Sequence, residues 1–383
     1  MIRLNSFYHT EKVMARKPEE QELPALYAFV QPGLEPIAAD EITRDLHGEV
    51  KRSERGMVVF RLGDITPAVL NLRTTEDVYL LAYGSDALTY KASDLDSIRK
   101  WTARKPDWPQ LLKLHHAVRP NTKGKPTFHI VCQMQGEHGY RRIDARQAME
   151  EGLLQVIPAG WTRVEENAWF EVWLTIQANT AVCGVRLTDR TMRHRTYKTD
   201  HVAASLRPTV AAAMVRLAGI APGMIVLDPM CGAGTILAEA VEICELRRMR
   251  DVQYLGGDID PNALYCSEQN LGRRGGVKLD RWDSTELPLG EESVDRIICN
   301  PPFGKQLATP EAIVPLYKDA VPEWDRVLKP GGRAVLLASE QDVLREAIAK
   351  VGWVPQRQLR VRVLGQQATL SVWQKPDAFA SMG

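Results

Sequence analysis

Four consecutive residues, Asn300-Pro301-Pro302-Phe303, form the segment whose types and spacing best suit chemistry. They follow the strand-like run Ser293–Cys299, which predicts a buried strand. A carboxamide, a backbone carbonyl and an aromatic ring would then lie together at the strand exit, held rigid by the two prolines. Such a slot suits a planar substrate with an –NH2 group, because the oxygens accept its hydrogens and the ring stacks on its face. Pro-Pro after a strand is also typical of a plain turn, so the motif alone leaves both interpretations open.

A second segment with chemical potential lies upstream, where the apolar run Ile225–Asp228 ends in an acid and is followed by a Gly-x-Gly turn. An apolar helix opens directly after this turn. Glycine lets the backbone approach a ligand closely, and a helix N-terminus offers free N–H groups. We therefore predict ligand contacts from Asp228, Pro229, Cys231, Gly232 and Gly234.

Two further acids follow predicted strands. Asp258 ends the run Tyr254–Asp258 and is placed to accept hydrogen bonds from vicinal ribose hydroxyls. Asp283 follows a further short strand and is placed to accept from an adenine amino group, although a solvated loop acid is the competing interpretation. Asp260, followed by Pro261, is better explained as a helix N-cap.

The turn around Gly232 differs from both common nucleotide-binding loops. Leu237 replaces the third glycine of the dinucleotide fingerprint, and no Gly-Lys-Ser/Thr follows as in a P-loop. A loop with its own acid and without a phosphate-binding lysine suits a nucleoside with a zwitterionic tail. We therefore predict S-adenosylmethionine as the cofactor, with Asn300 next to it. Transfer of its methyl group requires positioning of the reactants, so no metal and no general base are expected.

The motif Asn300-Pro301-Pro302-Phe303 resembles that of class I methyltransferases acting on exocyclic amines, and its extension to Gln306 resembles the RNA guanine-N2 branch. The N-terminal half resembles the THUMP-bearing members of this branch. The matching pieces are Tyr27–Glu35, Ala38–Ile42, Phe128–Cys132, Arg141–Asp144 and Arg193–Lys198. One departure lies in the connector, where the usual Arg-Gly-Tyr-Arg is replaced by Arg195-Thr196-Tyr197-Lys198.

This resemblance implies an α/β fold: a Rossmann-like class I methyltransferase with a doubly wound, mostly parallel sheet, preceded by an α+β ferredoxin-like and THUMP-type RNA-binding region. It also implies that Asn300 and Pro301 hold the target amine and that Phe303 stacks on a base taken out of its helix. Thr209 would lie in the first cofactor-contacting helix, although a helix simply started by Pro208 stays open.

Charge is balanced overall, with 49 basic and 48 acidic residues, but it is uneven locally. Between Lys91 and Arg146 there are 12 basic and 5 acidic residues, and between Arg186 and Lys198 there are 5 and 1. Basic stretches in a neutral protein fit a local phosphate-binding face, although ordinary solvated loops have the same composition. As RNA contacts we predict Arg141, Arg142, Arg193, Arg195 and Lys198, with Lys305 beside the flipped base.

The elements that must position these residues fall into two groups. In the first half we predict helices over Pro36–Asp45, Leu70–Tyr83, Asp94–Trp101 and Asp144–Gln155, with an irregular stretch from Trp101 to Pro126 and a hairpin of Ala168–Gln177 and Thr180–Arg186. From Ala221 strands and helices alternate, which predicts a parallel sheet closed by a terminal antiparallel pair. The predicted divisions are a loose extension (1–23), an RNA-binding region (24–189), a basic linker (190–204) and a methyltransferase domain (205–383).

Composition limits the remaining possibilities. The six cysteines lack C-x-x-C spacing and lie mostly in apolar runs, so we expect reduced core residues. The sequence has no signal peptide and no apolar run long enough to span a membrane, so a cytoplasmic protein is expected, without membrane partners and as a monomer.

The leading hypothesis is N2-methylation of a guanosine in tRNA. The alternatives are the same chemistry on ribosomal RNA guanine, methylation of adenine in DNA or of glutamine in protein, and RNA binding without catalysis.

Overall fold

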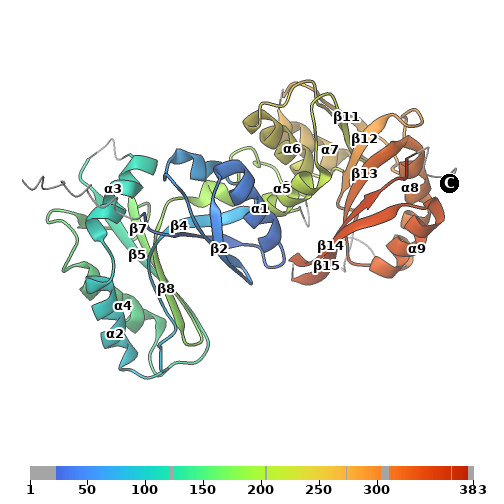
Figure 1. The fold of residues 1–383 in the computed structure, drawn as a ribbon. Helices are drawn as coiled ribbons and strands as arrows, with labels where there is room; N and C mark the ends of the chain where they lie inside the picture. Colours follow the sequence, from blue (N-terminus) through green and yellow to red (C-terminus); the bar gives the residue numbers. More distant parts are fainter. Residues whose placement is uncertain are drawn as a thin grey trace, which may run out of the picture.

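The computed structural model describes residues 23–120, 124–202, 205–272, 274–302, 310–363 and 365–377. The described residues form two sheets, one in each half of the chain, and Figure 1 shows them in separate lobes. Every helix in the described part of the chain is too short or too polar to span a lipid bilayer.

The N-terminal half contains an eight-stranded sheet in the order β2-β3-β1-β4-β8-β7-β5-β6. Its strands are β1 (Leu26–Val30), β2 (Glu49–Glu54), β3 (Met57–Arg61), β4 (Thr75–Ser85), β5 (Thr127–Gln135), β6 (Thr162–Arg163), β7 (Phe170–Gln177) and β8 (Thr180–Arg186). Its helices are α1 (Glu35–Leu46), η1 (Pro67–Asn71), α2 (Asp94–Arg104), α3 (Trp108–Val118), α4 (Arg142–Leu153) and η2 (Arg190–Met192).

Strand β4 lies in the middle of this sheet and joins two modules. Its first residues pair with β1, and its later residues, from Tyr79 to Ser85, pair with β8. The helix predicted over Leu70–Tyr83 is therefore wrong. The physical reason is burial on both faces, which removes the period-two alternation and leaves a continuous apolar run.

Helix α3 replaces most of the irregular stretch predicted between Trp101 and Pro126. Asp107 caps it, because its carboxylate accepts a hydrogen bond from the backbone N–H of Gln110 at 3.0 Å. Pro109 fits the first turn, where no intrahelical N–H bond is needed. Trp108 and Pro109, which lie in the stretch predicted to be irregular, thus begin a helix.

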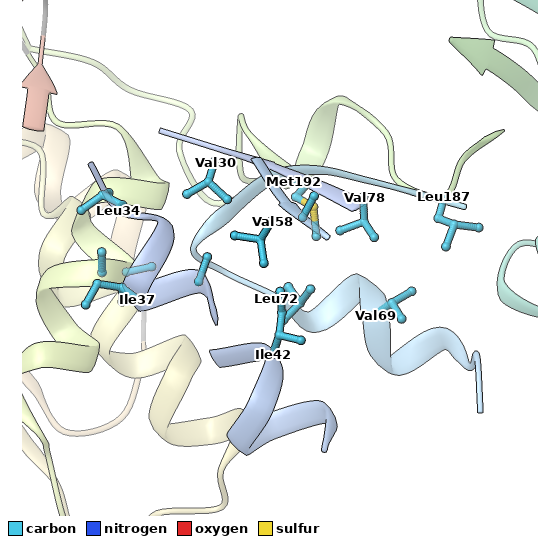
Figure 2. Packing of buried hydrophobic residues seen from close by; sticks show 14 of the residues in the cluster. Val30, Leu34, Ile37, Ile42, Val58, Val69, Leu72, Val78, Leu187 and Met192 are labelled. Carbon is cyan, nitrogen blue, oxygen red and sulfur yellow. The ribbon is translucent and has the colours of Figure 1, made fainter. Parts of the chain in front are cut away.

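The core of the first module lies between its sheet and the helical segments α1 and η1. Figure 2 shows Ile37 and Ile42 of α1 and Leu72, next to η1, packed against Val58 and neighbouring strand residues. The same apolar cluster continues into the C-terminal half through the connector residues that follow β8.

The C-terminal half contains a seven-stranded sheet in the order β11-β10-β9-β12-β13-β15-β14. The strands are β9 (Ile225–Asp228), β10 (Gln253–Asp258), β11 (Val277–Arg281), β12 (Val294–Cys299), β13 (Leu328–Ala338), β14 (Val354–Val363) and β15 (Gln366–Gln374). The helices are α5 (Pro208–Ala218), α6 (Thr235–Leu246), α7 (Pro261–Leu271), α8 (Pro310–Val327) and α9 (Gln341–Val351). Pairings from β11 to β13 are parallel, and β15 is antiparallel to β13 and β14. The predicted doubly wound, mostly parallel sheet is confirmed.

Buried ion pairs join the two halves. Arg73, between η1 and β4, donates from Nε to the Glu239 carboxylate of α6 at 2.6 Å. Glu239 also accepts from Arg195 Nε at 3.0 Å and from the Tyr197 hydroxyl at 2.7 Å, and its side chain is fully buried. Burial acts to raise the pKa of Glu239, but Arg195 and Arg73 outweigh it and hold that pKa below its ordinary value.

Candidate active site

Three neighbouring parallel strands end at one edge of the second sheet and bring the predicted side chains together. β9 lies between β10 and β12, with Asp228 level with Gly256 and Leu227 level with Ile297. Asp228 and Asp258 end their strands, and Asn300 directly follows β12. All three therefore lie along the same carboxyl edge, where ligands bind in doubly wound folds.

A cavity of about 710 Å³ opens at this edge. Most of the predicted cofactor residues line it, namely Asp228, Pro229, Cys231, Gly232, Asp258, Asp283 and Asn300. Its apolar surface includes Ile236, Ile259, Ala263 and Leu316. The cavity thus offers hydrogen-bond acceptors and an apolar environment to one ligand.

Asp228 is the most unusual acid of the cavity. Its Oδ1 accepts from the backbone N–H of Met230 at 3.4 Å, whereas its Oδ2 is buried and has no hydrogen-bond partner among the described residues. Burial raises the pKa of this carboxyl well above its ordinary value, and the nearby Asp258 adds to that rise. A ligand that is cationic or donates hydrogen bonds would remove this cost.

The Gly-x-Gly loop is held from several sides. Gly232 donates its N–H to Asp258 Oδ2 at 2.9 Å, and its carbonyl accepts from the Ser267 hydroxyl at 2.6 Å. The side-chain amide of Asn270 donates to the Ala233 carbonyl at 2.9 Å, and its oxygen accepts from the backbone N–H groups of the connector residues Thr199 and Asp200. The loop is therefore preorganised before any ligand binds.

The remaining acids, Asp258, Asp260 and Asp283, differ in their surroundings. Asp260 caps α7 by accepting from the Asn262 N–H at 2.9 Å, which confirms the N-cap interpretation. Asp258 is half-buried, and both of its oxygens accept backbone N–H bonds while it still faces the cavity. Asp283 is exposed at the cavity edge, and hydrogen bonds from Thr285 lower its pKa.

Cys231 contributes a small neutral wall rather than a nucleophile. Its thiol is 6% exposed and lies 3.5 Å from the Ser267 hydroxyl. Burial raises the pKa of the thiol, and the negative charge of Asp228 raises it further. The reactive thiolate is therefore disfavoured.

Asn300 presents its amide oxygen inside the cavity region. Asn300 Oδ1 is buried and has no hydrogen-bond partner among the described residues. Pro301 is buried, and Pro302 lines the cavity beside Asn300. Phe303 and Lys305 lie outside the described residues, and their predicted roles stay predictions.

Two predicted cofactor residues do not line the cavity. Thr209 is 2% exposed within the first turn of α5, and the residues before the helix, Ser205 and Leu206, face the cavity instead. Gly234 forms the αL N-cap of α6, with φ of 71°, where a side chain would press on Ser267 and Leu271. Both positions shape the wall from behind.

The predicted RNA contacts also divide. Arg141, Arg142 and Arg193 keep exposed side-chain surface. Arg195 is 7% exposed, and its donors go to Glu239, Met192 and Arg73, so its prediction as a phosphate contact is wrong. Lys198 is half-buried and donates to the Leu206 carbonyl, and burial lowers its pKa to about 8, so it braces the cavity wall.

Several cavity residues escaped the sequence analysis. Trp282 packs so closely on Gly257 that a Cβ there would collide with the indole, and its Nε1–H donates to the Pro229 carbonyl at 3.2 Å. Asp319 reaches the cavity from α8, far from any recognisable motif. Trp282 could have been found from its place directly before Asp283, whereas no sequence pattern marks Asp319.

The donor set fits the predicted cofactor. S-adenosylmethionine has a zwitterionic amino acid tail, a cationic sulfonium, a ribose and an adenine, and the cavity offers the buried acid Asp228, the acid Asp258 at the next strand end and apolar walls. When bound it supplies an electrophilic methyl group. Across the described part of the chain, no three His, Cys, Asp or Glu side chains gather to hold a metal ion.

The chain is similar to known methyltransferases. Residues 195–369 match the RMKL-like methyltransferase domain. The tRNA (guanine(6)-N2)-methyltransferase of Thermus thermophilus is 28% identical over 329 residues, which cover 84% of this chain and 91% of that protein. The human U6 snRNA (guanine-N(2))-methyltransferase THUMPD2 is 34% identical over 233 residues, which cover 60% of this chain but only 44% of the relative. The crystal structure of TrmN from Thermus thermophilus superposes with a TM-score of 0.75 at 26% identity, over 92% of this chain and 99% of TrmN.

Fold and cavity together define a class I, S-adenosylmethionine-dependent methyltransferase. Residues 195–369 belong to the RMKL-like methyltransferase domain family, and the relatives that match the chain are named as RNA (guanine-N2)-methyltransferases.

Proposed function

We propose that this protein transfers a methyl group from S-adenosylmethionine to the exocyclic N2 amine of a guanosine in tRNA, giving N2-methylguanosine. The observation that carries the proposal is the buried Oδ1 of Asn300, which has no hydrogen-bond partner among the described residues and lies at the same cavity as Asp228. A buried acceptor without a donor is costly, and the hydrogens of a substrate amine supply the missing partner.

The chemistry needs this acceptor because the guanine amine is conjugated with its ring and is a poor nucleophile. Hydrogen bonds from its N–H groups to Asn300 Oδ1 and the Pro301 carbonyl would favour a pyramidal nitrogen and direct its lone pair at the methyl group. They would also stabilise the positive charge that grows on nitrogen as the C–N bond forms. The methyl C–S bond of the cofactor would break in the same step, with its electron pair left on the sulfur of S-adenosylhomocysteine, and the extra proton on nitrogen would leave to water.

RNA is the proposed substrate class because relatives over both halves are named for RNA guanine-N2 methylation. We propose that residues 24–189 dock the RNA as a THUMP-type region, residues 190–204 connect, and residues 205–383 catalyse. The exposed residues Arg141, Arg142 and Arg193 remain proposed phosphate contacts. The protein is proposed to act as a monomer in the cytoplasm.

Incubation with labelled S-adenosylmethionine and bulk tRNA, followed by nucleoside analysis, tests the proposal. We expect labelled N2-methylguanosine with the wild type and a loss of about a hundred-fold or more in kcat for Asn300→Ala. Asn71→Ala, which changes an exposed asparagine at the end of η1, is the matched control and should retain full activity. Label found only in ribosomal RNA, small nuclear RNA, DNA or protein would overturn the choice of tRNA.

A further inference from the structure

A second large cavity, of about 710 Å³, lies where the N-terminal half meets the β14–β15 hairpin. We call it the hairpin groove. One wall is the turn between β2 and β3, with Ser53, Glu54 and Arg55, and the other wall includes Arg360 and Arg362 of β14. Figure 1 shows the hairpin reaching toward α1 and the blue N-terminal lobe.

Close backbone contacts fix the two walls relative to each other. Gly33, with φ of 100°, lies so near β14 that a Cβ would collide with the Arg360 carbonyl. The Gln31 side-chain amide donates to the Arg362 carbonyl at 2.6 Å. The groove is therefore a built feature of the junction, made from segments far apart in the sequence.

The acids of the groove have hydrogen-bond or ion-pair partners, whereas its arginines form no ion pair with a described residue. Glu35 accepts backbone N–H bonds from Gly33 at 2.9 Å and from Gly56 at 2.5 Å. Glu54 forms an ion pair with Arg52.

The side chains of Arg55, Arg360 and Arg362 are exposed, and none forms an ion pair with a described residue. The only side-chain bond shown for these three runs from Arg362 Nε to the Gly365 carbonyl at 3.1 Å, among the described residues. The groove thus presents three arginines without an ion-pair partner among the described residues, against one carboxylate, Glu35, that only backbone N–H groups contact.

Strand register places this charge on the catalytic edge of the sheet. Arg360 pairs with Thr369, which is level with Ala338, the last residue of β13. Cys299, directly before Asn300, is level with Leu336 of β13. Three strand spacings separate β12 from β14, so the groove lies about 14 Å from Asn300 along one edge.

We propose that the hairpin groove binds the phosphate backbone of the RNA strand that carries the target nucleotide, with Arg55, Arg360 and Arg362 as phosphate contacts. This inference rests on the proposed function for the identity of the nucleic acid. Arginines without an ion-pair partner among the described residues, in a groove at the catalytic edge, match a phosphodiester chain, and their planar guanidinium groups bind phosphate oxygens in pairs.

The test compares four full-length proteins in filter binding to bulk tRNA over a series of salt concentrations. The triple variant Arg55→Gln, Arg360→Gln, Arg362→Gln should reduce the slope of log K against log salt by about 2 to 3, since each phosphate contact contributes roughly one. The corresponding triple lysine variant should restore most of this slope. Arg357→Gln, an exposed arginine on the same strand that does not line the groove, should leave it unchanged.

Steady-state kinetics give the second readout. The triple glutamine variant should raise the KM for tRNA by about ten-fold or more while kcat and the KM for S-adenosylmethionine stay near wild type, because the catalytic cavity is unaltered. An unchanged salt slope and KM would overturn the groove as an RNA site. Failure of the proposed function would look different, because the wild type itself would then form no N2-methylguanosine in tRNA.

Discussion

Asp228 and Asn300 are two buried acceptors at adjacent strand ends, each with an oxygen that lacks a partner among the described residues. The first is an ionisable acid, which suits the positively charged groups of the cofactor, and the second is a neutral amide, which suits a neutral amine. Both were predictable, because each lies in a short local motif that shows its position at a strand exit.

Replacement of Asp228 by asparagine should separate stability from cofactor binding. Burial raises the folded-state pKa of this acid, so the ligand-free wild type loses stability as pH rises from the unfolded value of about 3.8 toward the folded value. Over this range we expect the free energy of unfolding of the variant to rise relative to that of the wild type, by up to about 1.4 kcal/mol per pH unit.

The same variant should bind S-adenosylmethionine about ten- to a hundred-fold more weakly, because a charged acceptor is lost. Denaturant titrations at pH 4.5 and 8 and calorimetric binding measure the two effects. A pH-independent stability difference, or unchanged affinity, would contradict the assignment.

Gly257→Ala tests the close contact beneath the cavity. The added methyl group would collide with the indole of Trp282, whose Nε1–H donates to the Pro229 carbonyl. We expect a loss of about 1–3 kcal/mol in the free energy of unfolding together with weaker cofactor binding. Gly290→Ala, at a position where an added methyl group meets no atom within 4 Å, is the control and should change neither quantity.

At the scale of elements, α6 links the cofactor loop to the rest of the molecule. The helix begins directly after Gly234 and carries Glu239, which receives Arg73 from the N-terminal half and Arg195 from the connector. Any shift of this helix would move both the loop and the junction between the halves.

Glu239→Gln should therefore destabilise the protein by about 3 kcal/mol at neutral pH, because it leaves the buried guanidinium group of Arg195 without its anion and that of Arg73 with only the partly exposed Glu242. The pKa of Glu239 is lowered in the folded state, so this contribution is present above the unfolded value of about 4.5 and is lost as pH falls through the folded value. Glu242→Gln, which removes the partly exposed second partner of Arg73, should cost much less. Chemical denaturation of both variants at pH 7 and pH 3.5 checks the order and its pH dependence.

Sequence patterns predicted the parallel sheet, the caps and the ligand loop, since each depends on residues near one another in the chain. They failed for Arg195, whose main partner is 44 positions away and whose burial is set by the packing of the two halves. They failed for β4 because a strand between two others loses its alternation. Asp319 escaped because only the fold brings α8 to the cavity.

At the scale of the whole molecule, the two halves are also held through Arg216 of α5. This residue is 4% exposed, and it pairs with Asp45 at 2.6 Å and Asp40 at 3.4 Å, both on α1. A second basic residue, Arg247, pairs with Asp45 from a more exposed position. These ion pairs fix α1 of the N-terminal half against the C-terminal half.

Loosening this contact should change where methyl groups are placed more than how fast they are transferred. We expect Arg216→Gln to spread N2-methylguanosine over additional guanosines of tRNA, because the docked RNA would reach the cavity at variable positions. Arg247→Gln should preserve the wild-type pattern. Mass spectrometry of ribonuclease fragments measures the distribution, and an unchanged single position in Arg216→Gln would contradict the idea.

The eight-stranded sheet of the N-terminal half has a consequence for length measurement. Because β4 pairs with β1 at one end and with β8 at the other, hydrogen bonds run without a break from the module beside the catalytic half to the outer module (Figure 1). If the outer module docks the RNA as proposed, the sheet would set a fixed distance between the docked end and the module beside the catalytic half. The modified nucleotide would be selected by its distance along the RNA from the docked end. A change in the length of this sheet would therefore shift the modified position.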